Sequence, residues 1–322
     1  MKMRLSPHSS AWRLGIAARP LMGLLVLGIL LAGCAAQNGD NTPISGHLIA
    51  TGSTALQPLI TQAAKSYMQL HAGVTIVVNG GGSYAGLDAV TSTDPTKRAD
   101  IGDSDVYADP AIYPDPNLTD NLVCVIPFAM VVNPTVNVTT IKRTDIIDIF
   151  ATGKITDWSQ LGAPSQKIVP IVRTAKSGTR ATFRRYLLGG LDESANLTTI
   201  DSSQDVLKAV ANTPGAIAYL ALSVVDATVR QLQIDGVDAT PANVIAGHYP
   251  FWSFEHMYTL GDDGNRPLID FIHYMTSNNV QNVAQGLKYI PIAAMQLQTA
   301  STTSFVYPNT APIALKREDD LG

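Results

Sequence analysis

The apolar residues of this chain follow two alternating patterns. Short apolar runs bounded by polar and glycine residues are typical of strands, and apolar residues that recur every three or four positions are typical of amphipathic helices. The runs that predict strands are residues 46–53, 73–80, 167–175, 215–222 and 249–261. The segments that predict helices are residues 54–71, 83–92, 144–151, 178–189, 203–213 and 266–278. This alternation predicts an α/β fold with helices that cross over between strands.

Two longer apolar passages bracket the middle of the chain, at residues 121–134 and 248–260. We interpret them as the places where the chain crosses between two lobes. The segment between 106 and 121 is rich in proline and aspartate, which predicts a loop on the surface.

The composition is that of a globular protein. The chain has 322 residues, of which 46% are hydrophobic and 15% are charged. It is therefore long enough to bury a sizeable core in one large or two medium domains. Its net charge of -4 is small and has the wrong sign for a surface that follows nucleic-acid phosphates. No nucleic-acid partner is expected.

The N-terminal segment has the features of an export signal. Basic residues precede an apolar run at 20–34, which is short for a membrane span but typical of a secretory signal. The run ends in Leu-Ala-Gly-Cys, which resembles the bacterial lipobox, and this resemblance implies that Cys34 carries the lipid anchor. We therefore predict a signal peptide at 1–33 and a polar tether at 34–45. The alternatives are an ordinary signal peptide and a marginal membrane helix.

Glycines and small hydroxyl residues gather where three of the predicted helices begin. The segments are 51–54 (TGST), 79–83 (NGGGS) and 177–179 (SGT). The first turn of a helix has unpaired N–H groups and a partial positive charge, so each segment can donate to an anion. Serine or threonine is also the commonest way to begin a helix, so one such segment alone says little. Together with Arg173, which precedes the third, they predict an anion site at the carboxyl ends of the strands.

An acidic stretch, residues 99–105 (ADIGDSD), bears on the choice of anion. Asp100, Asp103 and Asp105 would fit a solvated turn or a cation site, but no other oxygen ligands converge nearby for calcium. If Asp105 faces an anion, it repels the ligand unless the ligand has a proton to donate. Phosphate has such a proton at neutral pH and sulfate does not.

Several motifs occur in the order and spacing of a known family. They are GSTALQPL, GGGSYAG, ADIGDSD, GKITDWSQL, RTAKSGTRATF and PGAIAYL. In this respect the chain resembles the phosphate-binding proteins of ABC-type phosphate importers, the PstS family, from about Gly46 to the KYIPI at 288–292. The resemblance implies a periplasmic-binding-protein fold, in which two α/β lobes close on the ligand like a clamshell and hold it in the cleft between them.

The resemblance also implies lobe boundaries and a role. Lobe 1 would comprise residues 46–127 and 257–315, and lobe 2 residues 128–256. The protein would be a monomeric receptor rather than an enzyme, without cofactor or metal. It would bind inorganic phosphate and deliver it to the membrane permease subunits of the importer, either lipid-anchored on the outer face of the bacterial cell membrane or in the periplasm.

The phosphate contacts of the family fall on matching positions of this sequence. The hydroxyl of the first helix start falls on Thr54 and the N–H group after it on Ala55. The hydroxyl that follows the second glycine run falls on Ser83, and the carboxylate that accepts the ligand's proton falls on Asp105. The remaining contacts fall on Arg173, Ser177, Gly178 and Thr179.

Other readings have less support in the sequence. The same kind of receptor could be tuned to arsenate, sulfate or molybdate, and arsenate is protonated like phosphate. A phosphate-ester hydrolase would need a base or a metal near the hydroxyls, and neither a G-x-S-x-G motif nor histidines at metal-ligand spacing occur. Gly80, Gly82 and Ala85 match G-x-G-x-x-A, but a dinucleotide is an unexpected ligand for an exported protein.

Overall fold

Strands and helices alternate along the chain, as the apolar pattern predicts. The computed structural model describes residues 43–261 and 264–295. The strands are β1 (Ser45–Gly52), β2 (Gly73–Asn79), β3 (Ile101–Ser104), β4 (Leu118–Val132), β5 (Thr140–Ile141), β6 (Val169–Arg173), β7 (Thr198–Ile200), β8 (Ala216–Ala221), β9 (Arg230–Ile234) and β10 (Trp252–Leu260). The helices are α1 (Gln57–Leu70), α2 (Ser83–Val90), α3 (Arg143–Phe150), α4 (Gly178–Tyr186), α5 (Ser203–Asn212), α6 (Pro241–Ile245), α7 (Arg266–Met275) and α8 (Asn278–Gly286), with a 3₁₀ turn η1 (Trp158–Leu161).

All ten strands belong to one mixed sheet. Eight of them follow the order β2-β1-β3-β10-β4-β8-β6-β7, and β9 pairs with both β4 and β5. The pairs β1–β2, β1–β3, β6–β8 and β6–β7 are parallel. The strands β4 and β10 run antiparallel to their neighbours. The parallel pairs therefore lie on both sides of an antiparallel centre.

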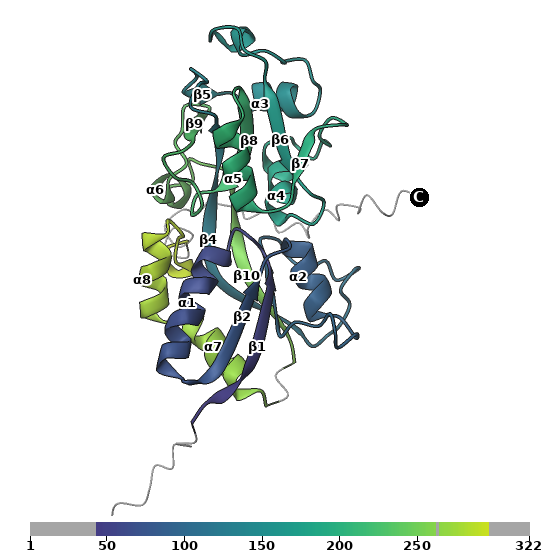
Figure 1. Ribbon diagram of the computed structural model, residues 1–322, viewed down its shortest axis with the longest axis vertical. Coiled ribbons are helices and arrows are strands. Elements are labelled where there is room, and N and C mark those ends of the chain that lie inside the picture. Colours follow the sequence, from purple (N-terminus) through teal and green to yellow (C-terminus); the bar gives the residue numbers. More distant parts are fainter. Residues whose placement is uncertain (1–42, 262–263, 296–322) are drawn as a thin grey trace, which may run out of the picture. The chain divides into compact units, whose positions relative to one another are not determined.

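The long strand β4 connects the two sides of the sheet. Its first part pairs with β10, from Leu118 opposite Leu260 to Pro127 opposite Trp252. Its last five residues, 128–132, pair with β8. Figure 1 shows β4 and β10 running between one group of elements that includes β1, β2, α1 and α2 and another that includes β6, β8, α4 and α5. The apolar passages 121–134 and 248–260 fall on these strands, while the lobe boundaries drawn from the sequence stay a prediction.

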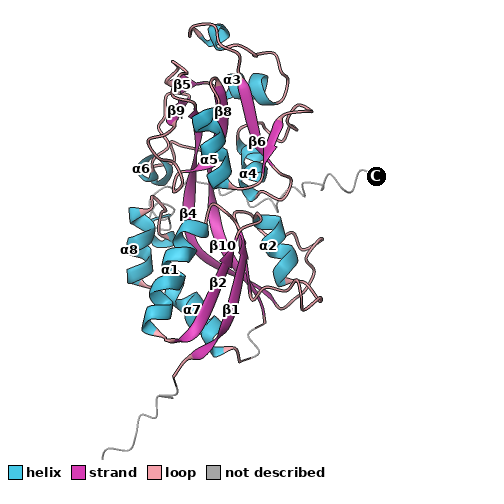
Figure 2. Cartoon of the chain, viewed as in Figure 1, coloured by secondary structure: helices cyan, strands magenta, loops and turns pink. Residues whose placement is uncertain are grey.

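Burial explains why β4 reads as a continuous apolar run. Its residues 123–132 are all buried, which is the pattern of a strand that is covered on both faces. Figure 2 shows helices on both sides of the strands, where they provide this cover. On one side α1 buries residues at helical spacing, from Leu59 to Tyr67. The Tyr67 hydroxyl donates to Asp270 of α7 at 2.7 Å.

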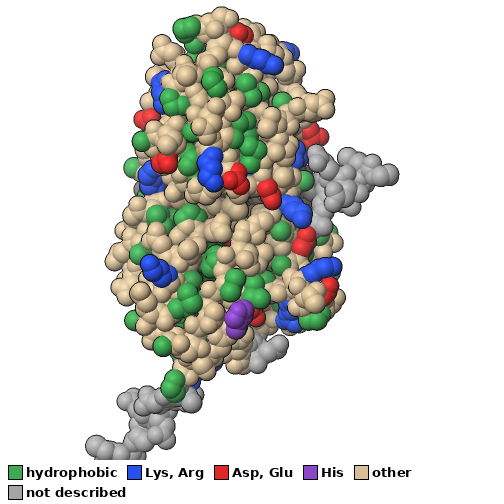
Figure 3. Space-filling view, viewed as in Figure 1, with side chains coloured by type: hydrophobic (Ala, Val, Ile, Leu, Met, Phe, Trp, Pro, Cys, Tyr) green, Lys and Arg blue, Asp and Glu red, His purple; other side chains and the backbone are tan. Residues whose placement is uncertain are grey.

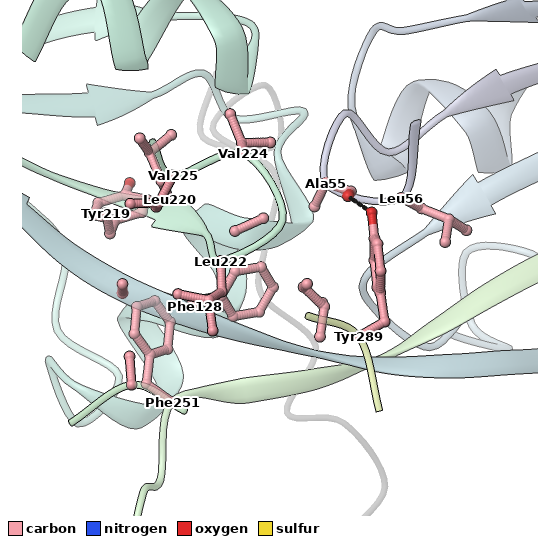
Figure 4. Packing of buried hydrophobic residues seen from close by; sticks show 14 of the residues in the cluster. Ala55, Leu56, Phe128, Tyr219, Leu220, Leu222, Val224, Val225, Phe251 and Tyr289 are labelled. Atoms are coloured by element: carbon pink, nitrogen blue, oxygen red, sulfur yellow. Dashed lines mark hydrogen bonds between the residues drawn. The ribbon is translucent and has the colours of Figure 1, made fainter. Parts of the chain in front are cut away.

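Aromatic side chains fill the core behind α4 and β8. The rings of Phe183 and Tyr219 stack at 4.0 Å between centroids, and Phe128 lies 5.1 Å from Phe251. Figure 4 shows Phe128, Tyr219 and Phe251 in this cluster, and farther along it Tyr289, whose hydroxyl donates to the carbonyl of Ala55. The core therefore fixes the backbone just before α1.

The strands and helices predicted from the apolar pattern are confirmed. The pattern missed β3, β5, β7, β9, α6 and α8, and it identified β4 only as the apolar passage 121–134. At the surface, Figure 3 shows basic and acidic side chains interspersed over the face in view. This distribution agrees with the small net charge of -4.

The stack of Phe183 on Tyr219 predicts a large loss of stability on truncation. Phe183 is fully buried, so Phe183→Ala leaves a cavity and should lower the free energy of unfolding by about 3–5 kcal/mol. Leu70→Ala, at a site that is 64% exposed, should change it by less than about 1 kcal/mol. Urea denaturation of both variants checks this, and equal losses would contradict the packing described.

Candidate functional site

Arg173, the last residue of β6, is the centre of the candidate site. It is only 2% exposed. Its Nε donates to the carbonyl of Asp201 at 2.9 Å, and its Nη2 donates to the same carbonyl. The backbone N–H of Arg173 donates to the Tyr219 hydroxyl at 3.3 Å. Among the described residues Arg173 forms no ion pair with a carboxylate, so its charge is buried without a direct counter-ion.

Two hydroxyls complete the surroundings of the guanidinium. Nη2 donates to Thr54 Oγ1 and Nη1 donates to Ser203 Oγ, each at 3.1 Å. The two hydroxyl oxygens lie 2.9 Å apart, and the Ser203 N–H donates to Thr54 Oγ1 at 3.2 Å. Thr54 precedes α1 and Ser203 begins α5, so two helix starts meet at one arginine. The sequence analysis missed Ser203, although a hydroxyl residue at a predicted helix start is part of the signal that identified the other segments.

The start of α4 lies close to Ser83 and Asp105. Ser177 is the N-cap residue, and its hydroxyl accepts from the N–H of Arg180 at 3.2 Å. Gly178 follows, and a Cβ atom there would lie 2.3 Å from Ser83 Oγ and 3.0 Å from Asp105 Cβ. The glycine therefore permits this approach. The N–H groups of the first turn of α4 lack intrahelical acceptors.

The start of α2 meets the loop before α4. Gly82, its N-cap residue, has a φ of 90°, and a Cβ atom there would lie 2.5 Å from the carbonyl of Lys176. The N–H of Tyr84 donates to that carbonyl at 3.1 Å. The Ser83 hydroxyl accepts from the N–H of Asp105 at 2.9 Å. The glycine run thus allows two backbone segments to pack directly against each other.

Asp105 receives hydroxyl donors from both sides of the site. Thr179 Oγ1 donates to its Oδ2 at 2.7 Å, and Ser53 Oγ donates to its Oδ1. Ser53 was outside the set of residues carried over from the family. Both carboxylate oxygens of Asp105 therefore have a hydroxyl partner. Asp105 is 2% exposed and Thr179 1% exposed, so this contact is sheltered from water.

The first helix begins later than the sequence suggests. We expected Ser53 and Thr54 at the cap or first turn, but α1 begins at Gln57 and its N-cap is Leu56. The Ser53 hydroxyl instead accepts from the N–H groups of Ala55 and Leu56 at 3.0 and 3.1 Å. The Ala55 N–H, which the family resemblance assigns to the ligand, therefore donates to Ser53 here.

The structure brings the residues predicted from sequence into one buried cluster. The contacts above join Thr54 to Arg173, Ser83 to Asp105, and Asp105 to Thr179, with Ala55, Ser177 and Gly178 adjacent along the chain. Cys34 lies outside the described residues. Asp100 is tied to the N–H of Ile49 at 2.8 Å, and no group of His, Cys, Asp and Glu among the described residues could hold a metal ion.

Burial dominates the electrostatics of this cluster. It lowers the pKa of the Arg173 guanidinium, while Tyr219, Asp105 and Asp201 act in the opposite direction. An anion placed against the guanidinium would offset the lost hydration. The cluster therefore combines a buried cation, hydroxyl groups and helix starts, which are the groups that bind an oxyanion.

Comparison with known proteins gives a consistent match. Residues 39–279 match the family described as the PBP superfamily domain. The phosphate-binding protein PstS of Bacillus subtilis is 40% identical over 256 residues, which cover 79% of this chain and 83% of that protein. The phosphate-binding protein PstS of Borreliella burgdorferi is 22% identical over 283 residues, covering 82% and 94%.

Solved structures show the same fold. A structure from Clostridium perfringens, described as a phosphate ABC transporter substrate-binding protein with bound phosphate, has a TM-score of 0.70 at 25% identity and covers 77% of this chain and 100% of that chain. An ABC-type phosphate transport receptor from Vibrio cholerae has a TM-score of 0.60 at 25% identity, with coverage of 76% and 99%. The mixed α/β arrangement is therefore a periplasmic-binding-protein fold.

The close approach at Gly178 gives a prediction about stability. Gly178→Ala places a methyl group against Ser83 and Asp105 and should cost about 1–3 kcal/mol through overpacking. Gly286→Ala, in α8 with no atom within 4 Å of the added carbon, should be neutral or stabilising. Thermal denaturation compares the two, and an unchanged Gly178→Ala melting temperature would show that the start of α4 does not pack as described.

Proposed function

The chain belongs to the PstS family of the PBP superfamily, and we propose that it captures inorganic phosphate and delivers it to the membrane permease subunits of an ABC-type phosphate importer. As a member of this family it is a receptor and not an enzyme. The observation that carries the proposal is the buried guanidinium of Arg173, which has hydroxyl and carbonyl partners but no carboxylate partner among the described residues.

We place the phosphate oxygens against Arg173 and the helix starts around it. Thr54 and Ser83 supply hydroxyls, and Ser177, Gly178 and Thr179 supply the first turn of α4. Binding at Thr54 and Ala55 requires them to exchange their present protein partners for the ligand. Such exchanges are favourable when the new acceptor is charged, because charge-assisted hydrogen bonds are stronger than neutral ones.

Asp105 selects the protonation state of the ligand. Its carboxylate accepts a proton that phosphate still carries near neutral pH and that sulfate lacks. Sulfate would instead bring unprotonated oxygens against a buried carboxylate, and the two would repel each other in a medium of low dielectric constant. Arsenate is protonated like phosphate, so Asp105 does not distinguish it from phosphate.

The anchor and the location are also part of the proposal. The apolar run before Cys34 and the polar segment after it support an exported protein that is held at the outer face of the cell membrane by a lipid on Cys34. The first strand begins at Ser45, so the last residue of the predicted tether, 34–45, already belongs to β1. We expect the receptor to act as a monomer.

Removing the buried cation should abolish most of the binding. Arg173→Ala should weaken phosphate binding by about 2–5 kcal/mol, because the anion would be left with dipoles alone. Arg173→Lys should retain only part of the wild-type affinity, because an ammonium group cannot make the bidentate contact that a guanidinium makes. Arg98→Ala, at an exposed position, is the control. If isothermal titration calorimetry gives the wild-type affinity for Arg173→Ala, the anion binds elsewhere.

Asp105 should set the preference for phosphate. The wild type should bind phosphate at least about a thousandfold more tightly than sulfate, on the order of 4 kcal/mol. Asp105→Asn should reduce this ratio of affinities, because the amide can also donate a hydrogen bond to an unprotonated sulfate oxygen. Asp115→Asn, on the exposed loop, is the control and should leave the ratio unchanged. Competition calorimetry on the three proteins measures the ratio. Comparable sulfate and phosphate affinities in the wild type would reject phosphate as the ligand.

Cys34 should be required for membrane attachment. Cys34→Ser should move the protein from the detergent phase to the aqueous phase in a phase-separation assay, because a lipid chain provides the membrane affinity. A chain that begins at Gly46 should still bind phosphate, because of the described residues it lacks only Pro43, Ile44 and Ser45, which lie before or at the start of β1, at the opposite end of that strand from Thr54. Retention of the Cys34→Ser protein in the detergent phase would contradict the lipid anchor.

A further inference from the structure

Glu255 is a buried carboxyl group that the proposed function does not use. It lies in β10, is 0% exposed and stands opposite Cys124 of β4. Ser253, two residues earlier and so on the same face of the strand, donates to the backbone carbonyl of Asp105. Two residues later, Met257 is opposite Asp103 of β3. The strand pairing therefore puts Glu255 beside the acidic segment of the site.

No donor satisfies this carboxyl group. Among the described residues, no N–H or O–H group donates to Oε1 or Oε2 of Glu255, and both atoms are buried. Glu193 is the useful contrast: its side chain is 2% exposed, but it forms an ion pair with Arg180 at 3.1 Å. Asp105, as described above, receives Thr179 and Ser53. Of the carboxyl groups that the structure describes, that of Glu255 alone has two buried oxygens that receive no N–H or O–H donor.

The groups that face Glu255 are acidic or neutral. They are Asp103 of β3, Asp105 in the loop that follows, Cys124 of β4 and Tyr289. None of these can supply a positive charge. Burial first, then the charge of Asp105 and a side-chain hydrogen bond with Asp105, and last the charge of Asp103, raise the pKa of Glu255 well above its ordinary range. An ionised carboxylate without a partner is among the costliest groups to bury, and protonation removes that cost.

We propose that Glu255 is a neutral carboxylic acid in the folded protein at neutral pH, and that it thereby leaves Asp105 as the acceptor carboxylate beside Arg173. A neutral Glu255 adds no negative charge to that of Asp105. An ionised Glu255 would add a second negative charge and disfavour every oxyanion. The proton on Glu255 therefore maintains the affinity of the site for an anion; that consequence rests on the proposed function, while the protonation does not.

Infrared difference spectroscopy tests the protonation directly. The spectrum of the wild type minus that of Glu255→Gln, recorded at neutral pH, should contain the carbonyl-stretch band of a protonated carboxylic acid, and this band should shift in D₂O. Glu193→Gln is the matched control, because Glu193 is equally buried but paired with arginine. Its difference spectrum should contain carboxylate bands instead. A carboxylate signal for Glu255 would overturn the proposal.

The stability of Glu255→Gln provides a second test. A carboxyl group with a raised pKa binds its proton more tightly in the folded state, so wild-type stability falls as the pH rises above 4.5, the ordinary value for glutamate. Glu255→Gln lacks this pH-dependent loss of stability. The unfolding constant of the variant divided by that of the wild type should therefore fall as the pH rises from 5 to 7, by up to about tenfold per pH unit. A constant ratio would contradict the proposal.

Phosphate titration of the wild type separates the two claims. If the acid band is present but phosphate does not bind, the protonation of Glu255 stands and the proposed function fails. If phosphate binds but the band belongs to a carboxylate, the function stands and the role of Glu255 is wrong.

Discussion

A guanidinium that is buried without a carboxylate partner is the constraint on which the rest of the site depends. Desolvating a charge is costly, and neutral hydroxyls and one carbonyl offset that cost only in part. The fold nevertheless places Arg173 at the end of β6, where it is 2% exposed and contacts Thr54 and Ser203. Such an arrangement is expected where the missing negative charge comes from a ligand.

The helices and strands around Arg173 bring residues that are far apart in the sequence into contact with it or close to it. The starts of α1, α2, α4 and α5 converge, and glycines at 82 and 178 let backbone and side chains approach closely. The long strand β4 links the two sides of the sheet from which these starts come. The aromatic core behind α4 holds Tyr219, whose hydroxyl in turn accepts from the backbone of Arg173. Tyr219 therefore connects the packing of the core to the position of Arg173.

Local patterns predicted more of the fold than of the site. Helical spacing and apolar runs identified α1, α4 and β8, because a buried face imposes a period on the sequence. Short elements such as β5 and α6 have too few residues for a period. The hydroxyls at helix starts pointed to Ser53, Thr54, Ser83 and Ser177, but the contact of Ser203 with Arg173 is a tertiary contact that no local pattern shows. The state of Glu255 depends on what surrounds it in three dimensions, and a single acid in an aromatic strand gives no such signal.

The proposed function depends on where an oxyanion binds. The most direct measurement is a crystal structure of the protein grown with phosphate. Phosphate oxygens should lie within hydrogen-bond distance of the Arg173 guanidinium, the hydroxyls of Thr54 and Ser83 and the first turn of α4, with one oxygen facing Asp105. Phosphate bound away from Arg173, or a saturated protein in which Arg173 contacts only protein groups, would contradict it.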